Sequence, residues 1–147
     1  MHHCSSFNQP IGDWDVSNVT YMYAAFAGAS IFNQPLNNWD VSNVTNMLGV
    51  FSRTTSFDQD ISDWDISNVS DFQVFARFVT LSTTNYDAIL IGWEATLQAA
   101  FPNGSGYTPS ITIDFGGSEY TGGGAAATAR ASLVSNFGWT IVDGGIA

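Results

Sequence analysis

The sequence predicts an α/β repeat solenoid, closed at its C-terminal end by a helix-strand-helix-strand cap. A motif recurs at a fixed interval of 25 residues, in copies one, two and three: 7–31, 32–56 and 57–81. Copies one and two are identical at 13 of their 25 positions. The period stops after residue 80, where different patterns begin. Self-similarity at such a period is the signature of stacked structural repeats.

The first half of each copy predicts a very short strand and a turn. In copy two this half runs Phe32-Asn-Gln-Pro-Leu-Asn-Asn-Trp39-Asp40. Its apolar positions are few, and turn-forming Pro and Asn residues separate them. Proline restricts backbone pairing, so we expect the strand to be short.

The second half of each copy predicts a short helical turn. It opens with Ser-Asn, which are good N-cap residues. In copy two, Val44, Met47 and Phe51 follow at spacings of three and four, which places them on one face. A single turn is unstable alone. We therefore expect equivalent residues of successive copies to pack in columns along the array.

Residues 1–80 are expected to form the repeat domain, and residues 81–147 a cap continuous with it. Strands are predicted at 111–115 and 139–142, and an Ala-rich helix at 125–137. The end of a stacked array exposes an apolar cross-section that such a cap covers. An amphipathic helix is predicted before the first of these strands by apolar residues at helical spacing: Tyr86, Ile89, Leu90, Trp93, Leu97 and Phe101.

The start of the chain is expected to be the tail of an earlier repeat. Residues 2–6 align with residues 27–31, at the end of copy one. The N-terminal face of copy one is therefore predicted to be uncapped. Cys4 lies in this tail, and we interpret it as a small packed residue in preference to a reactive thiol.

The motif F-N-Q-P-L-x-x-W-D-V-S-N-V-T-x-M resembles the BspA-like bacterial surface-protein repeat, a variant leucine-rich repeat. The match runs from Met1 to about Thr80. This resemblance implies a leucine-rich-repeat-like stack of short strands and short helical turns. It also implies an extracellular or cell-surface location and a role in adhesion or protein contact.

Composition argues against several classes of function. The net charge is −10 and there is no lysine, so repulsion disfavours nucleic acid as a partner. No apolar run is long enough to cross a membrane, so membrane insertion is not expected. No motif of a nucleophilic enzyme or a phosphate-binding loop is present, and the adjacent His2 and His3 are the only histidines. We expect no enzymatic activity and no organic cofactor.

Two sets of side chains are candidate sites. A polar row at one height of the array is the predicted binding face: Asn8, Gln9, Asn33, Gln34, Asp58 and Gln59. Solvated turn positions are the alternative interpretation. A calcium site is the second hypothesis, because carboxylates crowd copy three at Asp58, Asp60, Asp63 and Asp65. The alternative is that each Asp accepts a hydrogen bond within its own turn.

Asparagines also recur in glycosylation sequons, at Asn18, Asn43 and Asn68. Because the repeat itself recurs, a ladder of backbone-capping asparagines is the preferred interpretation.

The predicted function is a non-catalytic extracellular or cell-surface module for adhesion, or for binding a protein or glycan. The alternative is a structural protomer. In that case identical subunits would stack end to end through the bare N-terminal face into a filament or coat, because contacts that do not close propagate.

Overall fold

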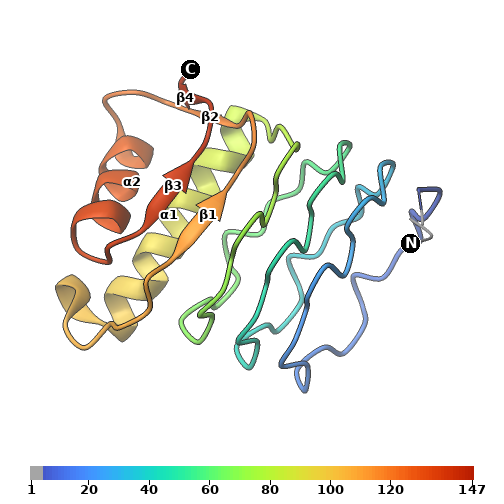
Figure 1. Cartoon of the computed structure of the whole chain (residues 1–147), viewed down its shortest axis with the longest axis horizontal. Coiled ribbons are helices and arrows are strands. Elements are labelled where there is room, and N and C mark those ends of the chain that lie inside the picture. The colour runs from blue at the N-terminus through green and yellow to red at the C-terminus, as the bar shows by residue number, and fades with distance from the viewer. Residues whose placement is uncertain (1–4) are drawn as a thin grey trace.

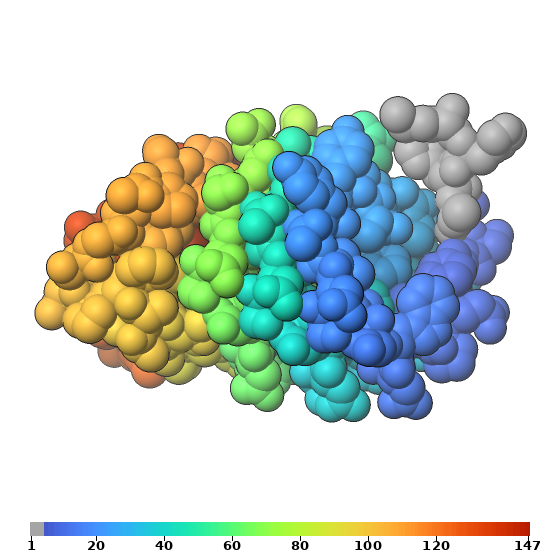
Figure 2. All heavy atoms as spheres, turned by 90° about the horizontal axis from the view of Figure 1, so that it is seen from below, coloured from blue at the N-terminus to red at the C-terminus, as the bar shows by residue number. Residues whose placement is uncertain are grey.

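The computed structural model describes residues 5–147 and divides the molecule into a repeat region and a C-terminal cap (Figure 1). We use "repeat region" for residues 5–81. The three copies lie side by side along the long axis, and the space-filling view shows them as adjacent bands that continue into the cap (Figure 2). Cys4 and most of the predicted N-terminal tail lie outside the described residues.

Within residues 5–147, regular secondary structure begins at residue 83. The two helices are α1 (Thr83–Ala100) and α2 (Ala125–Ser135), and a single 3₁₀ turn covers Pro102–Gly104. Strand β1 (Thr112–Asp114) pairs in parallel with β3 (Thr140–Val142), with Ile113 opposite Ile141. Strand β2 (Glu119–Tyr120) pairs in parallel with β4 (Gly145–Ile146). These strands form two separate two-stranded sheets.

The predicted fold class, an α/β repeat solenoid of the leucine-rich-repeat type, is therefore wrong. Over residues 5–147 the structure has two α-helices and four short strands in two small sheets, all within the cap. The described part of the repeat region has no helix or strand, only turns and isolated parallel bridges at Tyr21–Asn46 and Asn46–Asp71.

The predicted helical turn fails because residues with left-handed backbone conformation interrupt it. In copy one these are Ala24 (φ 52°) and Gly28 (φ 76°), and the equivalent residues of the other copies also have positive φ. A right-handed helix cannot continue through such residues. In addition, the N–H groups of Met22 and Ala24 donate to Asn46 and Leu48 of the next copy, at 2.9 Å each. The segment is a ribbon of linked turns that bonds outward.

Columns of equivalent aromatic residues form the core of the repeat region. The ring of Phe32 stacks between those of Phe7 and Phe57, with centroid separations of 5.7 and 6.3 Å. Trp39 and Trp64 stack at 6.4 Å. Such large buried rings dominate core energetics, so packing between copies stabilises segments that lack regular secondary structure.

The cap lies directly against copy three. The N–H of Ala76 donates to the carbonyl of Asp114 in β1 at 2.8 Å. Helix α1 is capped by Ser82, whose side chain accepts from the N–H of Asn85, and it buries Tyr86, Trp93 and three aliphatic residues. At Gly92 any Cβ would collide with the carbonyl of Ser62, so this glycine permits the close approach of helix and copy. Among the described residues, no helix combines the length and apolar character needed to span a membrane.

Candidate functional site

The predicted polar row exists, but its side chains bond mainly to one another. Asn8 Oδ1 accepts from the N–H of Asn33 at 3.0 Å and from Gln34 Nε2 at 3.0 Å. Asn33 Oδ1 accepts in the same way from the N–H of Asp58 at 2.9 Å and from Gln59 Nε2 at 2.8 Å. The row is a hydrogen-bonded ladder that ties each copy to the next.

Helix α1 continues this ladder. Asp58 Oδ1 accepts from the N–H of Ser82 and from Asn85 Nδ2, both at 2.9 Å. Asn85 therefore occupies the role of Gln34 and Gln59. Gln9 stands at the opposite end, and no residue among 5–147 accepts a hydrogen bond from its amide. The prediction that the row binds a ligand stays a prediction. Within the described residues, Gln9 is the glutamine of the row whose amide has no hydrogen-bond acceptor.

The aspartates of the candidate calcium site are dispersed. Asp60 Oδ1 accepts from the N–H of Ser62 at 2.9 Å and Asp65 Oδ1 from the N–H of Ser67 at 3.0 Å, while Asp58 bonds to the start of α1. Asp63 is exposed. Across residues 5–147 no group of three or more His, Cys, Asp or Glu side chains is arranged to hold a metal. The calcium hypothesis stays untested and gains no geometric support.

The equivalent aspartates of copies one and two have the same local role. Asp15 and Asp40 accept from the hydroxyl and the N–H of Ser17 and Ser42, respectively. These hydrogen bonds hold the pKa of each carboxyl below its ordinary value. The serine hydroxyl contributes most and the serine N–H adds to it. Both groups are exposed, so this shift marks a turn and carries little stability.

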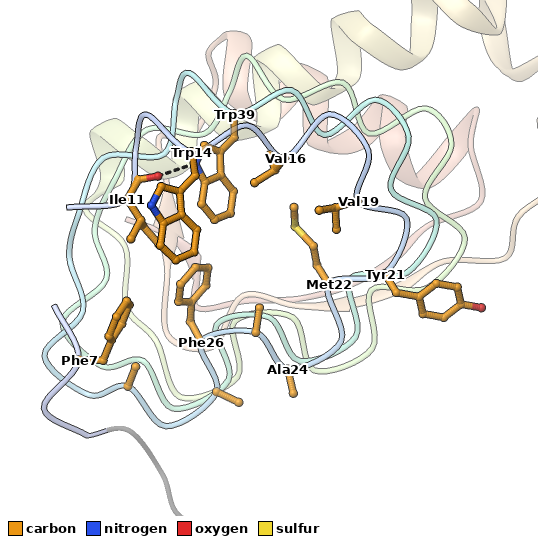
Figure 3. Close-up of a pocket in the computed structure, with 13 residues that line it drawn as sticks. Phe7, Ile11, Trp14, Val16, Val19, Tyr21, Met22, Ala24, Phe26 and Trp39 are labelled. Atoms are coloured by element: carbon orange, nitrogen blue, oxygen red, sulfur yellow. Dashed lines mark hydrogen bonds between the residues drawn. The ribbon is translucent and has the colours of Figure 1, made fainter. Parts of the chain in front are cut away.

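A further candidate site is an apolar hollow of about 510 Å³ in the N-terminal face of copy one (Figure 3). Trp14, Phe26 and Met22 point into it, with Trp39 of copy two behind Trp14, while Tyr21 points away at the rim. The lining residues are apolar or aromatic: Phe7, Ile11, Trp14, Val16, Val19, Tyr21, Met22, Ala24, Ala25, Phe26, Ala27, Ala29 and Trp39.

Three aromatic side chains of copy one are exposed to solvent. Trp14 is 62% exposed, Tyr21 70% and Tyr23 63%, whereas Trp64, at the position of Trp14 in copy three, is fully buried. Clustered exposed aromatic residues around a concave apolar surface are characteristic of interaction sites.

Backbone and indole groups of copy one also lack hydrogen-bond partners among residues 5–147. Trp39 Nε1 donates to the carbonyl of Ile11 at 3.0 Å and Trp64 Nε1 to that of Leu36 at 2.9 Å. For Trp14 Nε1, residues 5–147 supply no acceptor. The carbonyls of Tyr21 and Tyr23 likewise receive no N–H from these residues, although the equivalent carbonyls of Asn46 and Leu48 do.

A second exposed cluster combines positive charge with an aromatic ring. Phe78 is 54% exposed, and the guanidinium carbons of Arg53 and Arg77 lie 5.1 and 4.9 Å from its ring centroid. Arg77 also lies 3.9 Å from Asp114, the separation of a weak surface pair. These contacts are cation–π interactions of modest energy that hold the two arginines on the surface.

A buried polar network joins the elements of the cap. Asp143 accepts from Tyr86 Oη at 2.7 Å and from Arg130 Nε at 2.8 Å. Burial, followed by the hydrogen bond to Asp143, raises the pKa of Tyr86 far above its ordinary value. The same carboxylate raises the pKa of Arg130. Since these groups satisfy one another, the network is structural.

The uncapped face predicted for copy one stays a prediction, and the sequence analysis did not identify the exposed aromatic residues of that copy. Tyr21 and Tyr23 carried a signal: they stand where copy two has Asn46 and Leu48 and copy three has Asp71 and Gln73. The Phe78 cluster had no complete local signal, because Arg53 joins it from the preceding copy. The Asp143 network had none, because Tyr86, Arg130 and Asp143 are distant in sequence.

Comparison with known proteins places the repeat region in a family. The search of curated proteins and the search of solved structures returned no match. A family model described as "Mycoplasma protein of unknown function, DUF285" matches residues 1–89, which is more than half of the chain and includes the start of α1. The chain therefore belongs to the DUF285 family of Mycoplasma proteins.

Proposed function

We propose that this chain is a non-catalytic module, displayed outside the cell or on its surface, that binds a protein partner through the hollow in copy one. The observation that carries the proposal is the hollow itself, an apolar concavity of about 510 Å³ beside an indole that is 62% exposed. The resemblance of the motif to BspA-like surface repeats supports the location, and membership of the DUF285 family is compatible with it.

A protein partner suits this face better than a glycan. Glycan recognition needs free hydrogen-bonding groups beside aromatic rings. In the polar row, the amides of Gln34 and Gln59 are already engaged by Asn8 and Asn33. The hollow offers chiefly apolar area, and burying such area is the main driving force of protein association. Trp and Tyr are also the residues enriched at the centres of protein interfaces.

The non-catalytic part of the proposal rests on composition. The chain has no lysine, and its two histidines are adjacent at residues 2 and 3. The strongly shifted Tyr86 lies within the buried Asp143 network and bonds to its carboxylate. It is better explained by structure than by a reaction.

The binding surface is tested by photo-crosslinking in cells that produce the protein naturally. A benzophenone amino acid replaces Trp14 in one variant and Ile146 in a matched control, because Ile146 is equally exposed, at 65%, in the C-terminal strand β4. We expect a discrete crosslinked protein from position 14 alone. Equal products from both positions, or none from position 14, would contradict the proposal.

The location is tested separately by treating intact cells with protease. Digestion of the chain without cell lysis is expected, and complete protection until lysis would overturn the surface assignment.

The second candidate is the structural protomer, and exposed apolar residues in copy one and in the cap favour it. Trp14 marks one end, while Val142 and Ile146, 50% and 65% exposed, mark the cap. Light scattering over a concentration series, with and without calcium, distinguishes the two functions. A constant monomer mass eliminates end-to-end stacking, and growth with concentration supports it.

A further inference from the structure

We propose that the partner segment seated in the hollow carries the same 25-residue motif and docks in parallel register as one more layer. This inference rests on the proposed function, since it concerns the same surface. It follows from the contacts that every other copy makes with the layer before it, and four of these contacts are incomplete at copy one.

The first incomplete contact is the tryptophan hydrogen bond. Three indoles donate to a carbonyl of the preceding layer: Trp39 to Ile11, Trp64 to Leu36 and, from helix α1, Trp93 to Ile61, at 2.9–3.0 Å. Even the cap, which has a different local structure, reproduces this bond. Trp14 is the member of the column that has no acceptor among residues 5–147. A partner therefore needs a carbonyl at the position of the Leu36 carbonyl.

The second contact is the amide ladder. The side-chain amide nitrogens of Gln34, Gln59 and Asn85 donate to side-chain oxygens of the preceding copy. The acceptors are Asn8, Asn33 and Asp58, respectively. At copy one, Gln9 is the equivalent donor, and the N–H of Asn8 is equivalent to that of Asn33. One Asn or Asp at the first polar position of the motif would satisfy both groups. Hydrogen-bond matching of this kind provides specificity that apolar contact does not.

The third contact sets the polarity of the partner. Met22 and Ala24 donate to copy two, and Met47 and Gly49 donate to Asp71 and Gln73 of copy three at 2.8 and 2.9 Å. In this segment the donors point toward the C-terminal end, so copy one presents acceptors at Tyr21 and Tyr23. A second molecule offering its own first face presents carbonyls at its own Tyr21 and Tyr23 and no N–H groups from this segment. A motif layer offers N–H groups two residues apart, in the required parallel direction.

The fourth contact is the phenylalanine column. Phe32 has stacked neighbours on both sides, whereas among residues 5–147 Phe7 has one, Phe32 itself, at 5.7 Å. The leading Phe of a docked motif would cover the free side of Phe7. Each copy presents a surface of this kind to the preceding copy. The hollow has the same apolar shape, and its margins have the same hydrogen-bonding pattern.

The test supplies this layer to the full chain. A duplicate of residues 32–56 is inserted between Ser6 and Phe7, and the control insertion has the same composition in scrambled order. We expect the motif insertion to bury Trp14, lowering its acrylamide quenching about fivefold, with the Trp14 signal isolated by Trp14→Phe. The inserted N–H groups equivalent to Met47 and Gly49 should exchange at least about tenfold more slowly than those of the control.

The inference is overturned if Trp14 remains as accessible as in the scrambled control, or if those two amides show no protection. It is also overturned if the unaltered chain self-associates with Trp14 buried, because the occupant would then be a second copy. Failure here leaves crosslinking from position 14 to an unrelated protein intact. Protease protection in intact cells would instead remove the surface function and leave the docking geometry standing.

Discussion

Trp14 and Trp64 occupy the same position in copies one and three, yet Trp14 is 62% exposed and Trp64 is fully buried. The motif around them is nearly the same, Asp-Trp-Asp followed by Val-Ser-Asn or Ile-Ser-Asn. What differs is the neighbour. Copy two covers the rings of copy three on one side, and Trp93 of α1 contacts them on the other. Each copy therefore has two faces, one toward the preceding layer and one toward the next. Its rings are buried only where a neighbouring layer covers both faces.

Helix α1 shows that a segment with a different structure can cover one face of a copy. Trp93 donates to Ile61, and Ser82 and Asn85 donate to Asp58, as a fourth copy would. The helix reproduces three hydrogen bonds of the motif without its sequence. The cap is therefore matched to copy three through specific contacts as well as through apolar burial.

The largest expected effect is the difference in stability between substitutions at the two tryptophans. Trp64→Ala should lower the free energy of unfolding by about 3–5 kcal/mol, because it leaves a cavity in the core. Trp14→Ala should cost under about 1 kcal/mol, since its ring is largely in water already. Urea unfolding measures both. Similar losses for the two variants would mean that copy one is covered in solution.

The next effect concerns the buried network that only the capped end possesses. Tyr86→Phe should cost about 2 kcal/mol, because the buried carboxylate of Asp143 loses the hydrogen bond that Tyr86 Oη donates to it. Since folding raises the pKa of Tyr86, its contribution is complete below the ordinary tyrosine pKa of about 10 and declines as the pH rises above it.

Unfolding curves between neutral and alkaline pH test this prediction. The parent should lose stability above about pH 10, and Tyr86→Phe should lose less. Identical slopes for parent and variant would show that Tyr86 does not contribute to the alkaline transition.

The amide ladder provides a smaller, matched comparison. Gln34→Ala removes a donor that Asn8 uses, and should cost about 1 kcal/mol. Gln9→Ala removes the equivalent side chain where no described residue accepts from it, and should change stability by less than about 0.5 kcal/mol. Chemical denaturation of the two variants side by side is the measurement. A larger loss for Gln9→Ala would refute the assignment of Gln9 as the free end.

The smallest effects concern equivalent backbone positions with positive φ in copies one and two. Gly49 has φ 65° and its equivalent in copy one, Ala24, has φ 52°. Gly49→Ala should cost about 1 kcal/mol from backbone strain, because a Cβ there makes only ordinary contacts with Val74 and Ser52. Ala24→Gly should stabilise by several tenths of a kcal/mol as the same strain is released, less the entropy of the added glycine. Thermal unfolding resolves both, and opposite signs are required.

Several features were predictable from the sequence because they depend on short-range patterns. The 25-residue interval indicated equivalent positions in three copies, and Phe7, Phe32 and Phe57 do form one column. The helical spacing of Tyr86, Ile89, Leu90 and Trp93 indicated a buried face, and these residues lie buried in α1. Apolar spacing alone misled in the copies, where Val44, Met47 and Phe51 suggested a helical turn.

The recurring motif, the acidic charge and the positions of the apolar residues can be read from the sequence alone. The folded structure produces the linked turns of the copies, because bonds between copies take the N–H groups that a helix would use. It also decided which of several equivalent tryptophans is exposed and which amide stands at the end of its ladder. Equivalent residues have identical local patterns, and what distinguishes them is whether a neighbouring layer completes their contacts.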